Sequence, residues 1–255
     1  MKRLILTAAM VLCLCGASAA LAATGELVWS ADHETGDMSQ WPRATLNWDS
    51  GLCLYHGVST AYAHSGSYSL KLEISTLFGK AGCRQARNPE IATGNTYVYS
   101  AWYRLPKPVL TLRGQWNVFQ FKSKCPACSY SDPMWSINFE GDPLRPILKW
   151  SGGSSGLAGP QEGDGVAQRE YPNLVTTTPI GRWTVLKVRL RQSGGYTGRI
   201  TVWHDGVRIY DLSGVRTRYP DGSALWSVNN YSNGLTVNPY ALYIDDVSIR
   251  TPVAG

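Results

Sequence analysis

Charged side chains are scarce in this chain of 255 residues, at 16% of the total. Globular domains usually carry about 25%, so the composition argues against disorder, a coiled coil or a charge-rich helical bundle. Histidine is also rare, with four residues and no HxH or HExxH spacing that indicates a metal centre. No GxSxG, P-loop or GxGxxG appears between a predicted strand and a predicted helix. No single short motif therefore assigns a function.

Long apolar runs are absent after the first residues. The start reads as a secretory signal peptide, because Lys2 and Arg3 precede an apolar run over residues 4–15 and Ala20-Leu21-Ala22 offers the small residues of a cleavage site. That run is shorter than the ~20 residues that span a bilayer, so a membrane anchor is the weaker alternative. A lipid on Cys15 is weaker too, because Leu14 precedes it. We expect residues 1–22 to be removed and the mature protein to be secreted or periplasmic, away from the membrane.

The mature chain is mildly basic. The full chain has a net charge of +6, and removing Lys2 and Arg3 leaves 24 − 2 − 18 = +4. This charge permits an acidic polymer as partner without requiring one. Nucleic acid usually needs more cations on one face, whereas Lys and Arg are spread along this sequence. We expect a monomer that binds an acidic polymer other than nucleic acid.

Four cysteines remain after the signal: Cys53, Cys83, Cys125 and Cys128. An even count in an exported protein indicates two disulfides, and four cysteines allow three pairings. Cys125 and Cys128 form a CxxC that could close on itself, which would leave Cys53 with Cys83. A four-thiolate zinc site is the alternative, although only one CxxC is present.

Helical periodicity is absent after the signal, and short alternating segments take its place. They lie at residues 67–74, 96–105, 115–122, 135–139, 183–191, 199–211 and 241–250. In the fifth segment, Thr184, Leu186, Val188 and Leu190 share one face. Asp205-Gly206 lies between two alternating runs and predicts a tight hairpin turn. The pattern predicts an all-β protein, an antiparallel β-sandwich or barrel.

Residues 151–165 form a Gly- and Ser-rich segment, SGGSSGLAGPQEGDG. Such a segment can link two domains. The strands on either side look alike, however, and neither half reads as complete. We therefore expect a long loop within one domain over residues 23–255.

The segment 116–122 carries the first candidate site. Period two places Trp116, Val118, Gln120 and Lys122 on one face and Asn117, Phe119 and Phe121 on the other. The second face is typical of a core. The first combines a ring, an amide and an ammonium, which suits a sugar-binding groove, although a solvated sheet face has the same pattern.

Further candidates lie elsewhere in the chain. Arg84 and Arg87 flank Cys83, and arginine is the natural partner of a carboxylate. Tyr231 and Trp226 lie in a segment rich in hydrogen-bonding side chains, and a tyrosine can act as an acid or base. Glu140 and Asp142 are the best pair for a glycoside hydrolase, but they do not form a convincing one.

Several motifs together resemble a known family. They are DHETGDMSQW from Asp32, HSGSYSLKL from His64, YVYSAWYRLP from Tyr97, GRW from Gly181, VWHDGV from Val202 and YIDDV from Tyr243. In order and spacing the chain resembles the secreted concanavalin-like β-jelly-roll proteins, which include the heparin-, glucuronan- and alginate-lyase families. It is also similar to several jelly-roll carbohydrate-binding modules. The resemblance implies a jelly-roll fold and a sugar-related function.

The resemblance also implies site residues. Gln120-Phe121-Lys122 resembles the Gln-x-His motif of the alginate lyases, with Lys122 in place of His, and Tyr231 resembles their catalytic tyrosine. Arg84 or Arg87 resembles their arginine, but the acidic residue expected two positions on is absent. We expect β-elimination of a uronate polymer, in which Arg84 and Gln120 neutralise the carboxylate and Tyr231 and Lys122 move the proton.

The alternative is a non-catalytic sugar-binding or adhesive module that uses the same groove. Its stacking platforms would be Trp116, Trp135, Trp150 and Trp226, and Asn138 completes the expected substrate-binding set with Arg87. Similar jelly-roll modules often hold a structural calcium ion between the first and last strands. Glu34 and Asp246 match that pattern, with Asp245 as a substitute, and oxygen ligands suit calcium.

Overall fold

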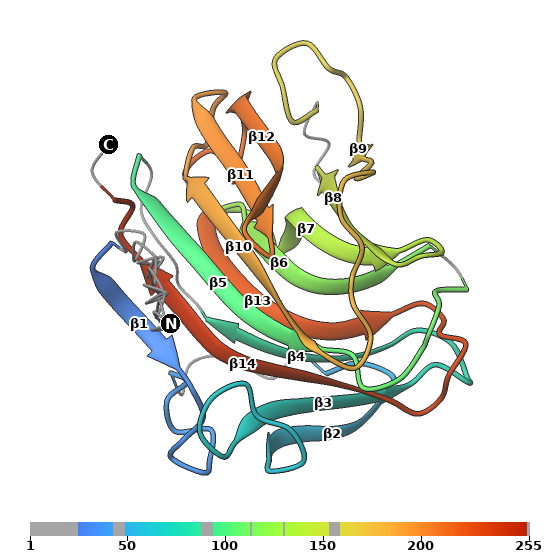
Figure 1. Cartoon of the computed structure of the whole chain (residues 1–255). Helices are drawn as coiled ribbons and strands as arrows, with labels where there is room; N and C mark the ends of the chain where they lie inside the picture. The colour runs from blue at the N-terminus through green and yellow to red at the C-terminus, as the bar shows by residue number, and fades with distance from the viewer. Residues whose placement is uncertain are drawn as a thin grey trace, which may run out of the picture.

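The computed structural model describes residues 25–42, 49–87, 94–112, 114–129, 131–152 and 159–253. The predicted signal peptide therefore lies outside the described residues. Two antiparallel β-sheets, one of eight strands and one of six, pack face to face (Figure 1). This arrangement confirms the predicted all-β sandwich of the jelly-roll kind.

The eight-stranded sheet runs in the order β12-β11-β10-β5-β14-β3-β2, and β1 pairs with β14. Its strands are β12 (Val207–Val215), β11 (Gly198–His204), β10 (Trp183–Arg191), β5 (Thr96–Arg104), β14 (Tyr240–Arg250), β3 (Ser69–Ser75), β2 (Leu52–Ser59) and β1 (Leu27–Ala31). Strands from both ends of the sequence thus lie side by side in one sheet.

The six-stranded sheet runs in the order β4-β13-β6-β7-β8-β9. Its strands are β4 (Ala81–Arg87), β13 (Ser223–Ser232), β6 (Trp116–Lys124), β7 (Asp132–Glu140), β8 (Arg145–Ser151) and β9 (Gln168–Tyr171). Residues 151–165 connect β8 to β9, which are neighbours in this sheet. Part of that segment, residues 153–158, lies outside the described residues.

The core fills the space between the sheets, and the alternation of the strands explains why. In β10, Leu186, Val188 and Leu190 are fully buried, whereas Lys187 and Arg189 between them are exposed. Burying a leucine or valine side chain stabilises a fold by about 1.5–3 kcal/mol. Each strand of this pattern therefore drives one of its faces into the core.

The predicted hairpin turn is present between β11 and β12. Asp205 has a φ of 49° and Gly206 a φ of 82°, which are the positive values that a type I′ turn requires. The Asp205 carboxylate also accepts a hydrogen bond from the Val185 N–H at 2.8 Å. The turn is thereby tied to the neighbouring strand β10.

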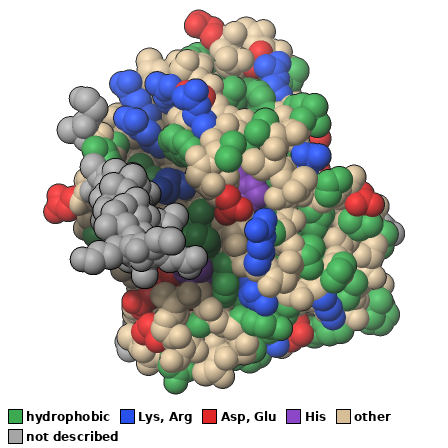
Figure 2. All heavy atoms as spheres, viewed as in Figure 1, with side chains coloured by type: hydrophobic (Ala, Val, Ile, Leu, Met, Phe, Trp, Pro, Cys, Tyr) green, Lys and Arg blue, Asp and Glu red, His purple; other side chains and the backbone are tan. Residues whose placement is uncertain are grey.

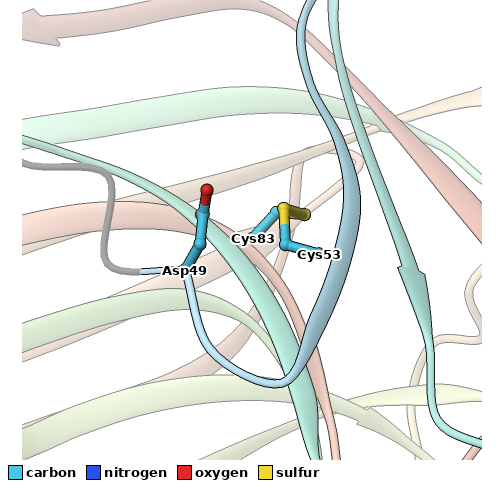
Figure 3. A group of neighbouring side chains, drawn as sticks. All are labelled: Asp49, Cys53 and Cys83. Atoms are coloured by element: carbon cyan, nitrogen blue, oxygen red, sulfur yellow. A yellow bond between two sulfur atoms is a disulfide. The ribbon is translucent and has the colours of Figure 1, made fainter.

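Two disulfides, Cys53–Cys83 and Cys125–Cys128, use all four cysteines of the described residues. The first joins β2 to β4 and thus cross-links the two sheets (Figure 3). Asp49 lies close to its sulfurs. The four-thiolate zinc alternative is wrong, because a disulfide sulfur is no thiolate ligand.

The described part of the chain contains no helix long and apolar enough to cross a membrane.

Candidate functional site

The outer face of the six-stranded sheet is polar. Register places Ser227, Gln120, Ser136 and Lys149 in one row across β13, β6, β7 and β8, and residues directly opposite each other share a face. A hollow of about 320 Å³ opens over this face, lined in part by Gln120, Asn138 and Lys149. Gln120 and Asn138 were both predicted as site residues, and both line the hollow.

A β-bulge in β6 changes which residues face the hollow. Asn117 pairs with Asn138 on β7 and Phe119 with Ile137, so Val118 has no partner of its own and the alternation breaks there. Trp116 consequently points into the core, where its Nε1 donates to Asn230 Oδ1 at 2.9 Å. Asn117 turns outward, opposite Tyr231. The prediction that Trp116 and Val118 face the groove and Asn117 the core is wrong.

The predicted stacking platforms are also wrong. The exposed fractions are 0% for Trp116, Trp135 and Trp226 and 1% for Trp150. Trp226 packs edge-on against Tyr99 at 5.0 Å between ring centroids, deep in the sandwich. Trp150 is among the residues that line the hollow, but its ring is buried like the other three. Large rings fill the space between two sheets efficiently, so these indoles serve the core and are not exposed platforms.

Arg84 and Tyr231 meet on the outer face. Tyr231 on β13 lies opposite Gly82 on β4, and the Arg84 guanidinium lies 4.0 Å from the centre of the Tyr231 ring. A Cβ at position 82 would approach the Tyr231 ring to 2.3 Å, so glycine is needed for the ring to lie there. The Asp49 carboxylate accepts the Arg84 N–H at 3.2 Å. Burial lowers the pKa of Arg84, while Tyr231 and then Asp49 oppose that shift.

Lys122 lies on the same face, further along β6. Burial, and then the charge of Arg84, lower the pKa of its ammonium to about 8, against the opposing effect of Asp132. Lys122 is opposite Leu225, whereas Tyr231 is opposite Asn117. The two backbone positions are thus roughly 15 Å apart along the strands, at about 3.3 Å per residue. Arg84 contacts Tyr231 directly and acts on Lys122 through its charge.

Arg87 faces the opposite side of β4. It pairs with the buried Trp226, and its guanidinium lies 4.9 Å from the centre of the Trp29 ring. Arg87 lies three positions after Arg84, and an odd offset along a strand reverses the face. The prediction that Arg87 binds substrate in this groove is therefore wrong.

Buried amides form the floor between Arg84 and the hollow. The Asn229 Nδ2 donates to Asn117 Oδ1, and the Asn138 Nδ2 donates to Glu140 Oε1 at 2.9 Å. Among the described residues, the Asn117 Nδ2, Asn138 Oδ1 and Asn229 Oδ1 have no hydrogen-bond partner. Buried polar groups in proteins are nearly always satisfied, so these atoms are suited to ligand or water. Asn117 and Asn229 were missed, because the sequence does not show the bulge.

The pair of carboxylates considered for a hydrolase is not assembled. Lys149 forms an ion pair with Glu140 at 2.8 Å. Asp142 lies beyond the end of β7, in the exposed turn to β8. A glycoside hydrolase needs two carboxylates on either side of the scissile bond, and this geometry does not supply them.

Glu34 and Asp246 lie against the same segment, residues 64–68, but each is satisfied by protein donors. The Glu34 carboxylate accepts the N–H groups of Ser67 and Tyr68 at 2.8–3.0 Å. Asp246 accepts hydrogen bonds from Ser65 Oγ at 2.8 Å and the His64 ring at 2.5 Å. These N–H and O–H donors do not fit a cation at the same oxygens.

Calcium binding at Glu34 and Asp246 is untested and stays a prediction, which these hydrogen bonds do not support. A chelator such as EGTA should lower the melting temperature if the ion is present, and should leave it unchanged if these hydrogen bonds suffice.

Comparison with known proteins agrees with the fold and gives the family. The family model described as "Polysaccharide lyase" matches residues 33–248. An endo-β-1,4-glucuronan lyase from the fungus Trichoderma reesei superposes with a TM-score of 0.60 at 16% identity, over 91% of this chain and 94% of that one. An alginate lyase from Chlorella virus gives 0.61 at 14% identity, over 89% and 100%. A marine alginate lyase from Aplysia kurodai gives 0.56 at 11% identity, over 90% and 98%.

No curated protein matches the sequence. The match over residues 33–248 covers most of the chain, which therefore belongs to the polysaccharide lyase family. The predicted resemblance to the jelly-roll lyases is confirmed.

Proposed function

We propose that this chain cleaves a uronate-containing polysaccharide by β-elimination, with Arg84 and Tyr231 at the reacting sugar. The observation that carries the proposal is the contact between the Arg84 guanidinium and the Tyr231 ring, 4.0 Å apart beside a floor of buried amides. Membership of the polysaccharide lyase family supports it. The solved structures with the same fold include lyases of glucuronan and alginate.

The first requirement of the reaction is a cation at the carboxylate of the sugar. The proton on C5 of a uronate is only weakly acidic, and neutralising the adjacent carboxylate stabilises the enolate-like anion that forms. Arg84 supplies a planar guanidinium that matches a carboxylate. The Asn117 Nδ2 lacks a partner among the described residues and lies on the strand opposite Tyr231. It is suited to donate a second hydrogen bond.

The second requirement is a group that moves the proton. In the proposed reaction Tyr231 takes the C5 proton and delivers it to the departing O4. The C5–H and C4–O bonds break, a double bond forms between C4 and C5, and the proton ends on the leaving oxygen. The charge of Arg84 beside the ring stabilises negative charge as it develops.

Lys122 has a different role in this proposal from the base that was predicted. Its backbone position lies five residues along β6 from Asn117, which is opposite Tyr231. It lies on the same face as Gln120, at a position suited to the carboxylate of a neighbouring sugar. We assign Lys122 and Gln120 to binding of the polymer next to the reacting unit.

The alternative of a non-catalytic binding module has lost its main support. It relied on exposed indoles in the groove, and all four candidates are buried.

The two disulfides fit an oxidising compartment. We propose that the mature protein acts outside the cytoplasm, as a secreted or periplasmic monomer.

The test of the function is the ultraviolet absorbance of the unsaturated uronate that β-elimination creates. Purified protein is incubated with alginate, glucuronan, heparin and pectate, and the polymer that responds identifies the substrate. Tyr231→Phe should lower kcat at least about 100-fold, the scale of a lost acid–base catalyst, and leave binding of that polymer nearly unchanged.

Tyr62→Phe is the matched control. The Arg104 guanidinium lies 4.3 Å from the centre of the Tyr62 ring. The control therefore changes another arginine–tyrosine pair, one that lies at the eight-stranded sheet and away from the groove. This variant should keep full activity. Wild-type turnover by Tyr231→Phe would exclude the proposed role of Tyr231, and no unsaturated product from any of the four polymers would count against the function.

A further inference from the structure

The outer face of the eight-stranded sheet carries a second feature, a concentration of positive charge. Figure 2 shows Lys and Arg side chains gathered on the side where β10 and β11 lie. Lys187, Arg189 and Arg191 alternate along β10 and are all exposed. At about 3.3 Å per residue, neighbouring cations in this row are roughly 6.6 Å apart.

Register extends this row across neighbouring strands. Arg191 lies opposite Arg199 on β11, and Arg189 lies opposite Val98 on β5, which in turn lies opposite Arg250 on β14. Lys187 lies opposite Trp203, and Trp203 lies opposite Arg208 on β12. We call this set the basic face; its cations are Lys187, Arg189, Arg191, Arg199, Arg208 and Arg250.

The basic face is strongly positive. These rows contain one acid, Asp211, which binds Arg199 at 2.7 Å and Arg208 at 3.3 Å. Six cations less one acid leave +5, whereas the chain without residues 1–22 has a net charge of only +4. Within the described residues, no carboxylate lies within ion-pair distance of Lys187, Arg189 or Arg191. Five of these cations lie on the consecutive strands β10, β11 and β12, and the sheet brings Arg250 of β14 to them.

The basic face also contains two hollows, and the residues that line them can bind a sugar. A hollow of about 380 Å³ is lined by Arg189, Arg191 and the hydroxyl residues Thr96, Thr197 and Ser213. A second, of about 290 Å³, is lined by Lys187, Arg189 and the half-buried Trp203. Guanidinium groups bind carboxylates, hydroxyls bind hydroxyls, and an indole stacks on a sugar ring.

We propose that the basic face is a second, non-catalytic binding surface for the uronate polymer on which the groove acts. The inference rests on the proposed function for the identity of the polymer, while its support is the charge and lining of the face itself. The groove and the basic face lie on the outer sides of opposite sheets, with the core between them. A short oligosaccharide in the groove therefore does not reach the basic face, whereas a long polymer can occupy both surfaces.

A polymer that is bound at the basic face has a raised effective concentration near the groove. The predicted signature is a protein that binds and degrades long polymers better than short ones. Binding to the basic face should also weaken with salt, because exposed charges are screened.

The test separates the two surfaces. The variant Lys187→Ser/Arg189→Ser/Arg191→Ser removes the row on β10. Its matched control is Lys80→Ser/Lys107→Ser/Arg182→Ser, which removes three exposed cations outside the basic face. Both are made in the Tyr231→Phe background, so that binding is measured without cleavage, and in the wild-type background for turnover. The probe is long-chain alginate, or whichever uronate polymer yields unsaturated product.

We expect the β10 variant to bind the long polymer about tenfold more weakly, since each exposed ion pair contributes up to ~1 kcal/mol. The control triple should bind within twofold of the parent, and turnover of short oligosaccharides should be unchanged in both. Equal binding by the two triples overturns the proposal. Equally strong binding of the parent to DNA or to anionic lipid vesicles overturns it too, because the face would then recognise charge alone. Failure of the catalytic function appears separately, as absence of product in the wild type.

Discussion

Lys122 changes its charge close to neutral pH, because burial and the neighbouring Arg84 lower its pKa to about 8 from an ordinary 10.5. In the role proposed above, the charged form binds a carboxylate. KM should therefore rise as the pH rises through about 8, with little change in kcat. If Lys122 were instead the base, kcat would rise over the same range. Measurement of kcat and KM against pH for the wild type and Lys122→Met distinguishes the two.

The same variant has a consequence for stability, and its sign follows from linkage. The folded-state pKa of Lys122 lies below the unfolded-state value, so the unfolded chain binds more protons between about pH 8 and 10.5. Charged Lys122 therefore costs stability below about pH 8, and this cost disappears as the pH rises through that window. Lys122→Met should raise the melting temperature at pH values below 8 and gain little above the window.

Arg84 and Tyr231 show how far single residues could be predicted. Their chemical types made them candidates, and the structure brings them into contact. Arg87 was an equal candidate from the sequence, and only the pairing of β4 with β13 sends it to the other face. Asn117 was placed in the core because strict alternation was assumed through Val118.

At the scale of strands, alternation predicted well where the pairing is regular. The segment 183–191 was predicted with its buried face and coincides with β10, and the Asp205-Gly206 turn was found where expected. The bulge in β6 was not predictable, because a bulge depends on how two partner strands match in length and twist. Trp116, Asn117 and Val118 were therefore assigned to the wrong faces, whereas Gln120 and Lys122 lie on the face that was predicted.

The Cys53–Cys83 disulfide links β2 to β4 next to Arg84. Cys53→Ser/Cys83→Ser should lower the free energy of unfolding by about 2–4 kcal/mol, because a disulfide restricts the unfolded chain. It should also reduce activity, since Arg84 follows Cys83 directly. Denaturant unfolding and the product assay measure the two effects, with Cys125→Ser/Cys128→Ser as a control that leaves β4 untouched. Equal loss of activity in both variants would count against a specific effect on Arg84.

At the scale of the whole molecule, the distribution of charge over the surface was the property least predictable from the sequence. Lys and Arg appear spread along the chain, and this spread argued against nucleic acid as a partner. Strands β10, β11 and β12 follow one another in the sequence and carry five cations of the basic face, and β14 adds Arg250 from a distant part of the chain. The pairing of these strands, which the local pattern does not give, combines their outward positions into the basic face.

The burial of the indoles determines what intrinsic fluorescence can report. Trp116, Trp135 and Trp226 are buried in the core, so their emission shifts to longer wavelength when the sandwich opens. Trp203 is half-buried on the basic face and is therefore open to a soluble quencher, as are the half-buried Trp29, Trp102 and Trp183 elsewhere. A change in quenching on addition of polymer that is lost in Trp203→Phe thus reports occupancy of the basic face, whereas the emission shift of the buried indoles reports unfolding.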